Sequence, residues 1–113
     1  MLNRIAASQR KERGMHARVS TIHLDPARID QTVSDFEEQD LPRFRQIAGF
    51  RGFTLMLNRA SGKIVGTSYW DSPELMEASE DEGTSARKRV ADQGAAKSPP
   101  EVERFEVALD TFV

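Results

Sequence analysis

Alternating apolar and polar positions predict four β-strands in this chain. Residues 17–24, ARVSTIHL, are rich in β-branched residues. Residues 50–59, FRGFTLMLNR, and 63–70, KIVGTSYW, flank a short loop that contains Gly62, so we expect them to pair as an antiparallel hairpin. Residues 101–112, EVERFEVALDTF, alternate cleanly and are predicted to form the last strand.

The first helix is predicted between residues 25 and 49, where apolar residues recur mostly every three or four positions. Asp25 is a good N-cap, and Pro26 suits the first helical position. Pro42 lies inside the pattern and removes a backbone hydrogen bond. We therefore expect a kink or a restart around Leu41.

The second helix is predicted between residues 71 and 94. It begins with DSPE at residues 71–74, which supplies a capping side chain, a proline in the first turn and a carboxylate near the positive end of the helix dipole. Gly83 and Thr84 weaken its middle, so we expect a bend there. The resulting order, β-α-β-β-α-β, predicts an α+β, ferredoxin-like fold with a four-stranded antiparallel sheet.

Composition and charge narrow the possible functions. The 113 residues suit one domain, which we place at residues 16–113. A net charge of −2 gives no electrostatic reason to expect nucleic acid, and no apolar run approaches the ~18 residues that span a bilayer. We therefore predict no nucleic-acid partner, no membrane role and a cytoplasmic protein. Without cysteine, and with His16 and His23 seven apart, we predict no metal site.

Residues 1–15 are predicted to form an N-terminal arm. Basic side chains outnumber acidic ones in this segment, and it lacks the apolar stretch of a secretory signal. A native start at Met15 is one interpretation of this pattern. As an arm, the segment could contact phosphate or a partner, or be a plain appendage.

Two stretches of the chain resemble the antibiotic biosynthesis monooxygenase (ABM) domain family of the dimeric α+β barrel superfamily. The first is AGFRGFTLML at residues 48–57, and the second is KIVGTSYWDSPELMEA at residues 63–78. The resemblance covers about residues 16–113. It implies a homodimer in which two sheets meet face to face, with a ligand pocket between the sheet and the helices of each subunit.

The activities of the ABM family are diverse, so the resemblance supplies a short list of reactions. Several members oxidise polyphenolic rings with dioxygen and without a metal or flavin, others degrade haem, and others act on quinones or quorum signals. The haem-degrading branch uses a strand asparagine, where this chain offers Ser20 or Thr21. It also uses a tryptophan and a histidine in the second helix, which this sequence lacks there. Haem degradation of that type is therefore disfavoured, and no cofactor is expected.

Trp70 is the leading candidate for a catalytic residue, because the resemblance places the family's tryptophan at this position. Its indole N–H could stabilise negative charge that develops as oxygen adds to an activated ring. The alternative is a core or pocket-wall aromatic whose N–H has a protein partner. His23 is the candidate base, since a histidine can accept a phenol proton near neutral pH, although a lone strand histidine is also a common structural residue.

Four further residues are candidates for ligand binding. Ser68 shares a strand face with Trp70. Asn58 and Arg87 have the residue types implicated in cofactor-free ABM enzymes, although turn chemistry alone also explains Asn58. Met56 is a candidate either for the pocket or for packing at the sheet or dimer surface.

A sheet with helices on one side leaves its other face open, and this open face independently predicts a homodimer. The first functional hypothesis is a cofactor-free, monooxygenase-like enzyme that acts on a small aromatic or quinone-like molecule. The alternative is a non-catalytic dimeric module that binds or senses a small apolar molecule. A third is a protein whose cavity is filled by its own side chains and whose role lies in its surface.

Overall fold

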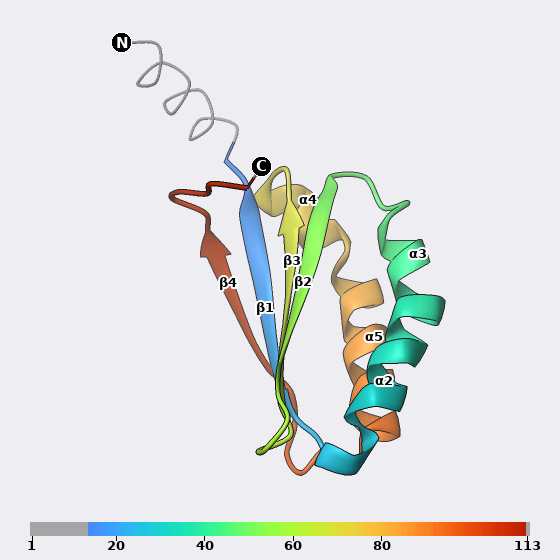
Figure 1. Cartoon of the computed structure of the whole chain (residues 1–113). Coiled ribbons are helices and arrows are strands. Elements are labelled where there is room, and N and C mark those ends of the chain that lie inside the picture. Colours follow the sequence, from blue (N-terminus) through green and yellow to red (C-terminus); the bar gives the residue numbers. More distant parts are fainter. Residues whose placement is uncertain (1–13, 113) are drawn as a thin grey trace.

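The computed structural model describes residues 14–112 and contains one sheet with all its helices on one face (Figure 1). Its strands are β1 (His16–His23), β2 (Phe50–Asn58), β3 (Lys63–Trp70) and β4 (Glu101–Glu106). They lie in the order β2-β3-β1-β4, and every neighbouring pair is antiparallel. This topology confirms the predicted α+β, ferredoxin-like fold with a four-stranded antiparallel sheet.

The β2–β3 hairpin forms as predicted. Asn58 pairs with Lys63 at its end, and the side chain of Asn58 accepts a hydrogen bond from the backbone N–H of Ser61. Gly62 has φ +82°, and a Cβ there would lie 2.0 Å from the carbonyl oxygen of Leu24. Only glycine fits this position, because a side chain would meet both backbone strain and another backbone atom.

The first helical region is divided into four elements. A 3₁₀ turn, η1 (Pro26–Arg28), leads into α2 (Ile29–Asp35), a π-helical turn η2 (Phe36–Asp40) and α3 (Leu41–Phe44). Asp25 caps the start, as its side chain accepts a hydrogen bond from the N–H of Ala27. The α-helix restarts at Leu41 with Pro42 in the first turn, which confirms the predicted restart.

The second helical region consists of α4 (Pro73–Ala78) and α5 (Glu80–Gln93), which meet at Ser79. The bend predicted at Gly83 and Thr84 is therefore misplaced, because both residues lie inside α5. Ser79 is fully buried, and its hydroxyl donates to the carbonyl of Met76 and accepts from Arg18. These two hydrogen bonds stabilise a break at Ser79, four residues before Gly83, where the low helix propensity of glycine had predicted it.

β4 ends at Glu106, so the predicted strand over residues 101–112 is too long. Its neighbour β1 begins at His16, which pairs with Glu106. Beyond this pair, one further backbone hydrogen bond joins Val107 to Met15. Strand geometry ends there because β1 begins at His16, so no residue of that strand lies opposite Val107. The predicted arm lies outside the described residues except for its last two positions, Gly14 and Met15.

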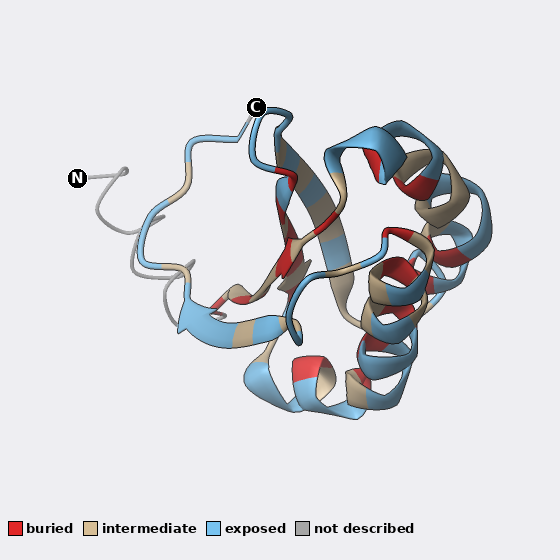
Figure 2. Cartoon of the chain, turned by 90° about the horizontal axis from the view of Figure 1, so that it is seen from below, coloured by how far each residue is buried: buried red, intermediate tan, exposed pale blue. Residues whose placement is uncertain are grey.

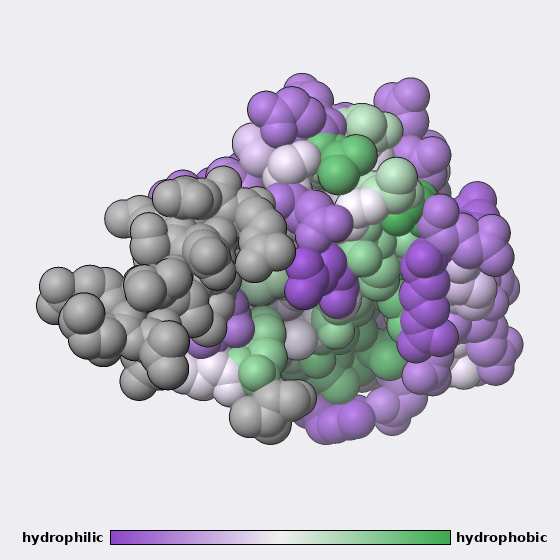
Figure 3. Space-filling model, turned by 90° about the horizontal axis from the view of Figure 1, so that it is seen from above, coloured by the Kyte–Doolittle hydropathy of each residue, from purple (hydrophilic) through white to green (hydrophobic). Residues whose placement is uncertain are grey.

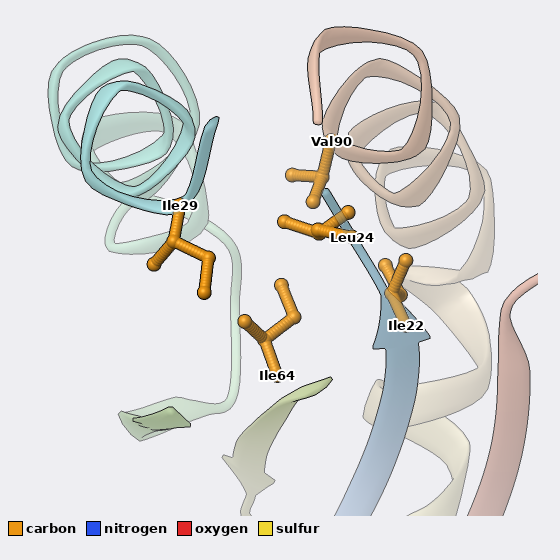
Figure 4. Close-up of a cluster of buried hydrophobic side chains, with 5 residues drawn as sticks. All are labelled: Ile22, Leu24, Ile29, Ile64 and Val90. Atoms are coloured by element: carbon orange, nitrogen blue, oxygen red, sulfur yellow. The ribbon is translucent and has the colours of Figure 1, made fainter. Parts of the chain in front are cut away.

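The core lies between the sheet and the helices and has two parts. One part, drawn in Figure 4, is formed by aliphatic side chains from β1 and the residue that follows it, from β3 and from both helical regions: Ile22, Leu24, Ile29, Ile64 and Val90. The other contains Phe44, Trp70, Met76 and Ala86. Figure 2 shows that buried residues lie on the sides of the sheet and helices that face each other. None of the helices among residues 14–112 is long and apolar enough to cross a membrane.

Candidate functional site

A cavity separates the inner face of the sheet from α2, η2 and α5. The cavity has a volume of about 60 Å³ and is partly open to solvent. In the space-filling view from above, hydrophobic residues gather between hydrophilic ones on the outer sides of the molecule (Figure 3). Most lining residues are apolar: Ile22, Val33, Phe36, Phe44, Phe53, Leu55, Ile64, Gly66, Gly83, Ala86 and Val90. The polar lining residues are Arg18, Ser20, Thr32, Ser68 and Arg87.

Phenylalanine rings form one part of the cavity wall. Phe36, at the start of the π-helical turn, stacks on Phe53 of β2 with ring centroids 4.9 Å apart. Phe44 of α3 lies 6.4 Å from Phe36, ring to ring. Three aromatic rings around one space favour a flat, apolar or aromatic ligand, because offset ring stacking adds to the hydrophobic gain.

Two arginines form the polar part of the wall. Arg18 lies on the inner face of β1 and has a side chain that is only 2% exposed. Its Nη1 donates to the carbonyl of Met76 at 3.2 Å and to Oγ of Ser79 at 3.1 Å. Arg87 comes from α5 and reaches the same space, where its Nη1 lies 3.5 Å from Oγ of Ser20. Strand β1 and helix α5 therefore bring two cations together against apolar walls.

Glu80, at the start of α5, is the carboxylate that holds these cations. Its Oε2 accepts from Arg18 at 3.2 Å, and its Oε1 accepts from Arg87 at 3.0 Å and from Arg104 of β4 at 2.8 Å. Burial opposes ionisation of Glu80, but the three guanidinium groups outweigh burial and hold its pKa below the usual range. Burial lowers the pKa of Arg18, whereas its hydrogen bond to Glu80 raises the pKa of Arg104.

Trp70 lies beside the cavity, outside its lining. The side chain is fully buried, and its Nε1 donates to Oγ of Ser68 at 2.8 Å. The indole also packs edge-on against Phe50 and lies 5.5 Å from Cζ of Arg18. Its N–H is therefore already bonded within the protein, and Trp70 acts as a packing partner for Arg18 and Ser68.

The other predicted site residues divide into two groups. Ser68 and Arg87 line the cavity, as does Gly66 on the face that Trp70 shares. His23, Asn58 and Met56 do not line it, because strand alternation places them on the opposite face of the sheet. Met56 is 60% exposed there. The structure therefore does not bring His23, the predicted base, near Trp70 or the two arginines.

Sequence reasoning missed Arg18 and Glu80. The available signal was that Arg18 occupies the same strand face as Ile22, where a charged side chain faces the core. A buried arginine needs a carboxylate partner, but strand alternation alone does not reveal which acidic residue of α5 supplies it. The described residues contain no group of three or more His, Cys, Asp or Glu side chains arranged to hold a metal ion.

Two proteins of Mycobacterium tuberculosis H37Rv are similar to this chain in sequence. Uncharacterized protein Rv2557 is 31% identical over 94 residues, and uncharacterized protein Rv2558 is 31% identical over 95 residues. The matches cover 83% and 84% of this chain but 41% and 39% of the two relatives. The chain thus spans about two fifths of the length of these curated relatives. No family model matches the chain.

Solved structures share its fold. The monooxygenase ActVA-Orf6 of Streptomyces coelicolor, in complex with Nanaomycin D, has a TM-score of 0.71 and 16% identity, covering 90% of this chain and 94% of that one. An antibiotic biosynthesis monooxygenase has a TM-score of 0.63 and 13% identity, covering 81% and 97%. The heme-degrading protein Rv3592 of Mycobacterium tuberculosis has a TM-score of 0.64 and 18% identity, covering 88% and 98%. At the level of the fold, these structures confirm the ABM resemblance predicted from the sequence.

Proposed function

We propose that this chain, which has the fold of the antibiotic biosynthesis monooxygenases, holds a small aromatic or quinone-like molecule in its cavity and oxidises it with dioxygen. The observation that carries the proposal is the cavity wall itself. Three phenylalanine rings and two arginines line one cavity, which is partly open to solvent. Such a wall suits a flat ring that carries oxygen substituents, because the rings stack on it and the cations attract its oxygens.

The proposed reaction requires no oxidant other than dioxygen. A hydroxyanthrone is a suitable test substrate: its ring CH₂ becomes C=O, one oxygen atom comes from O₂, and the other leaves as water with the two hydrogens. Loss of a substrate proton makes the ring electron-rich enough to react. Arg18 and Arg87 would stabilise the negative charge that results, since charge interactions are strong in a water-poor site.

A second candidate function is a binding module that returns its ligand unchanged. One observation favours it: among the described residues that line the cavity there is no histidine, carboxylate or tyrosine to remove a proton. In the oxygenase proposal, the substrate proton must therefore pass to water. A binding module needs no such step.

Oxygen consumption distinguishes the two functions. The full chain is incubated with hydroxyanthrones, hydroquinones and flavonols in an oxygen electrode, and the products are identified by mass spectrometry with ¹⁸O₂. The oxygenase proposal predicts turnover with one labelled oxygen atom in the product. Saturable binding of the same compounds without oxygen uptake would favour the binding module.

A matched pair of variants tests whether the cavity is the site. Val33 lines the cavity, whereas Val107 lies outside it and is similarly half-buried. Val33→Phe fills part of the space, so we expect it to lower ligand affinity about tenfold or more, as overpacking and lost contacts of about 1–3 kcal/mol predict. Val107→Phe adds the same atoms elsewhere and should leave affinity unchanged. Equal effects of both variants would contradict a site in this cavity.

A homodimer is also part of the proposal. The face of the sheet opposite the helices carries Met56, 60% exposed, and Phe105, 48% exposed. Exposed apolar side chains on this face are compatible with a contact to another chain, and the resemblance to the ABM family supplies a second copy as that partner. The cytoplasmic location expected from the sequence stays a prediction.

A further inference from the structure

The guanidinium of Arg18 has unused hydrogen-bonding capacity although it is buried. Its Nη1 makes three hydrogen bonds, to Met76, Ser79 and Glu80. Its Nη2 makes none with any residue between 14 and 112, and the side chain is 2% exposed. Nη2 is not sealed from solvent, and Arg18 lines the cavity, so this donor is available to an acceptor that enters the cavity.

Gly83, which has no side chain, lets both guanidinium groups pack closely against α5. A Cβ at Gly83 would lie 2.8 Å from Nη2 of Arg18 and 3.2 Å from Nη1 of Arg87. Both nitrogens therefore approach the same side of α5, and both arginines line the cavity. The two donors are close enough to serve one small group.

The local charge is unbalanced in favour of cations. Glu80 is the one carboxylate that Arg18, Arg87 and Arg104 share, and Glu77 acts on Arg104 from a greater distance. Three guanidinium groups and one shared carboxylate leave a net positive charge beside an apolar wall. Charges attract strongly there because little water screens them.

We infer that Arg18 and Arg87 form a subsite for an anionic oxygen group of the ligand, a carboxylate or an ionised phenol. This inference rests on the proposed function, because it orients the aromatic ligand in the same cavity. The anionic group binds at Nη2 of Arg18 and at Arg87, and the ring lies along Phe36 and Phe53. Glu80 is the first anion of this cluster and keeps both arginines in place. The anionic group of the ligand would be the second.

Paired probes test the charge and the ring separately. 2-Naphthoate and 2-naphthamide have the same ring and nearly the same shape, and only the first is an anion at neutral pH. Isothermal titration calorimetry of the full chain should show naphthoate binding about tenfold or more tightly than the amide, the ratio expected for hydrogen bonds to a charged group.

Variants then assign the preference to the cluster. Arg87→Gln should reduce the preference for naphthoate to about twofold, because the charged probe loses more than the neutral amide while the ring contacts of both remain. Arg87→Lys keeps the charge and should recover part of the preference. The control is Arg59→Gln, which removes an equal charge from the exposed hairpin, where Arg59 pairs with Asp30. Thermal melts confirm that each variant is folded.

The outcomes separate the inference from the proposed function. Loss of the preference in Arg87→Gln alone, with partial recovery in Arg87→Lys, supports the subsite. Equal binding of both probes by the wild-type chain overturns the subsite but leaves a ring-binding cavity. Equal loss in Arg87→Gln and Arg59→Gln also overturns it. Failure of both probes and of the whole oxygenase panel to bind overturns the proposed function and the subsite together.

Discussion

The indole Nε1 of Trp70 donates a hydrogen bond to Oγ of Ser68 at 2.8 Å, and of these two residues only Ser68 lines the cavity. The two residues lie on the same face of β3, two positions apart. The hydrogen bond turns the indole toward the interior of the protein, where it packs beside Arg18. Trp70 therefore contributes to the site indirectly, because it holds Ser68 and Arg18 in position.

The first prediction concerns this hydrogen bond. Trp70→Phe removes the N–H and part of a fully buried ring, so we expect the free energy of unfolding to fall by about 2–4 kcal/mol. Ligand affinity should change less than about threefold, because contacts in the lining persist. Urea denaturation and calorimetry measure the two quantities. A large loss of affinity without a loss of stability would show direct contact between Trp70 and the ligand.

A double-mutant cycle provides the control for this pair. Ser68→Ala leaves the buried indole N–H without its acceptor and should cost about 1–3 kcal/mol. If the hydrogen bond is the shared cause, the double variant Trp70→Phe with Ser68→Ala costs less than the sum of the two single variants. Additive effects would contradict an energetically significant bond.

The second prediction concerns the pH dependence that Glu80 gives to stability. Its pKa in the folded protein lies below the usual value of 4.5, because three arginines outweigh the effect of burial. The ionised form therefore stabilises the fold fully above pH 4.5, and this stabilisation is lost as the pH falls through the lower folded-state pKa. Glu80→Gln should lower the free energy of unfolding at pH 7 by about 1–3 kcal/mol.

The measurement is urea denaturation of wild type and Glu80→Gln from pH 7 down to the acid range. The difference between the two proteins should be constant above pH 4.5 and shrink below it. Glu38→Gln, at an exposed site in η2, is the matched control and should change stability by no more than about 0.5 kcal/mol. A difference that grows on acidification would refute the assigned sign.

Much of the fold was predictable because it follows from local rules. The Asp25–Pro26 cap, the restart at Leu41 and the β2–β3 hairpin all depend on residues close in sequence. The end of β4 and the break at Ser79 depend instead on distant partners. The pairing of β4 ends where its neighbour β1 begins, at His16. The break at Ser79 depends on a hydrogen bond from Arg18, which is 61 positions away in the sequence.

The site was less predictable than the fold for the same reason. Strand alternation placed Ser68 and Trp70 on the same face of their strand without indicating which face is inner, and a residue-type argument selected Arg87. No local rule indicates that the hydroxyl of Ser68 accepts the hydrogen bond of the Trp70 indole N–H. The grouping of Arg18 with Glu80 joins β1 to α5, and only tertiary structure brings these two residues together.

The third prediction concerns Gly83, where two effects oppose each other. Alanine in the first turn of α5 gains up to about 1 kcal/mol in helix propensity. Its Cβ would lie 2.8 Å from Nη2 of Arg18, whose guanidinium is held by Met76 and Ser79. Displacing Arg18 weakens hydrogen bonds worth about 1.5–3 kcal/mol, so we expect Gly83→Ala to be destabilising overall.

Thermal and urea denaturation measure the net effect of Gly83→Ala, and 2-naphthoate titration measures its effect on the anion subsite, which should weaken. Gly52→Ala is the control, because a Cβ at Gly52 meets nothing within 4 Å. That substitution should change stability by less than about 1 kcal/mol and leave binding unchanged. A stabilised Gly83→Ala variant with normal binding would contradict this prediction, because it would show that the Arg18 side chain moves away from residue 83 without loss of stability.

The last prediction concerns the open face of the sheet. If a second copy covers this face, the exposed side chain of Met56 lies in the interface, where a charge would be stripped of water. Met56→Lys should then weaken the dimer about tenfold or more, as sedimentation velocity over a concentration series would show. Gln39→Lys adds the same charge at an exposed site in η2, on the helical side, and should leave the dimer intact.

A wild-type chain that stays monomeric at the highest concentration reached would refute a homodimer. Dissociation by both variants alike would instead attribute the effect to net charge.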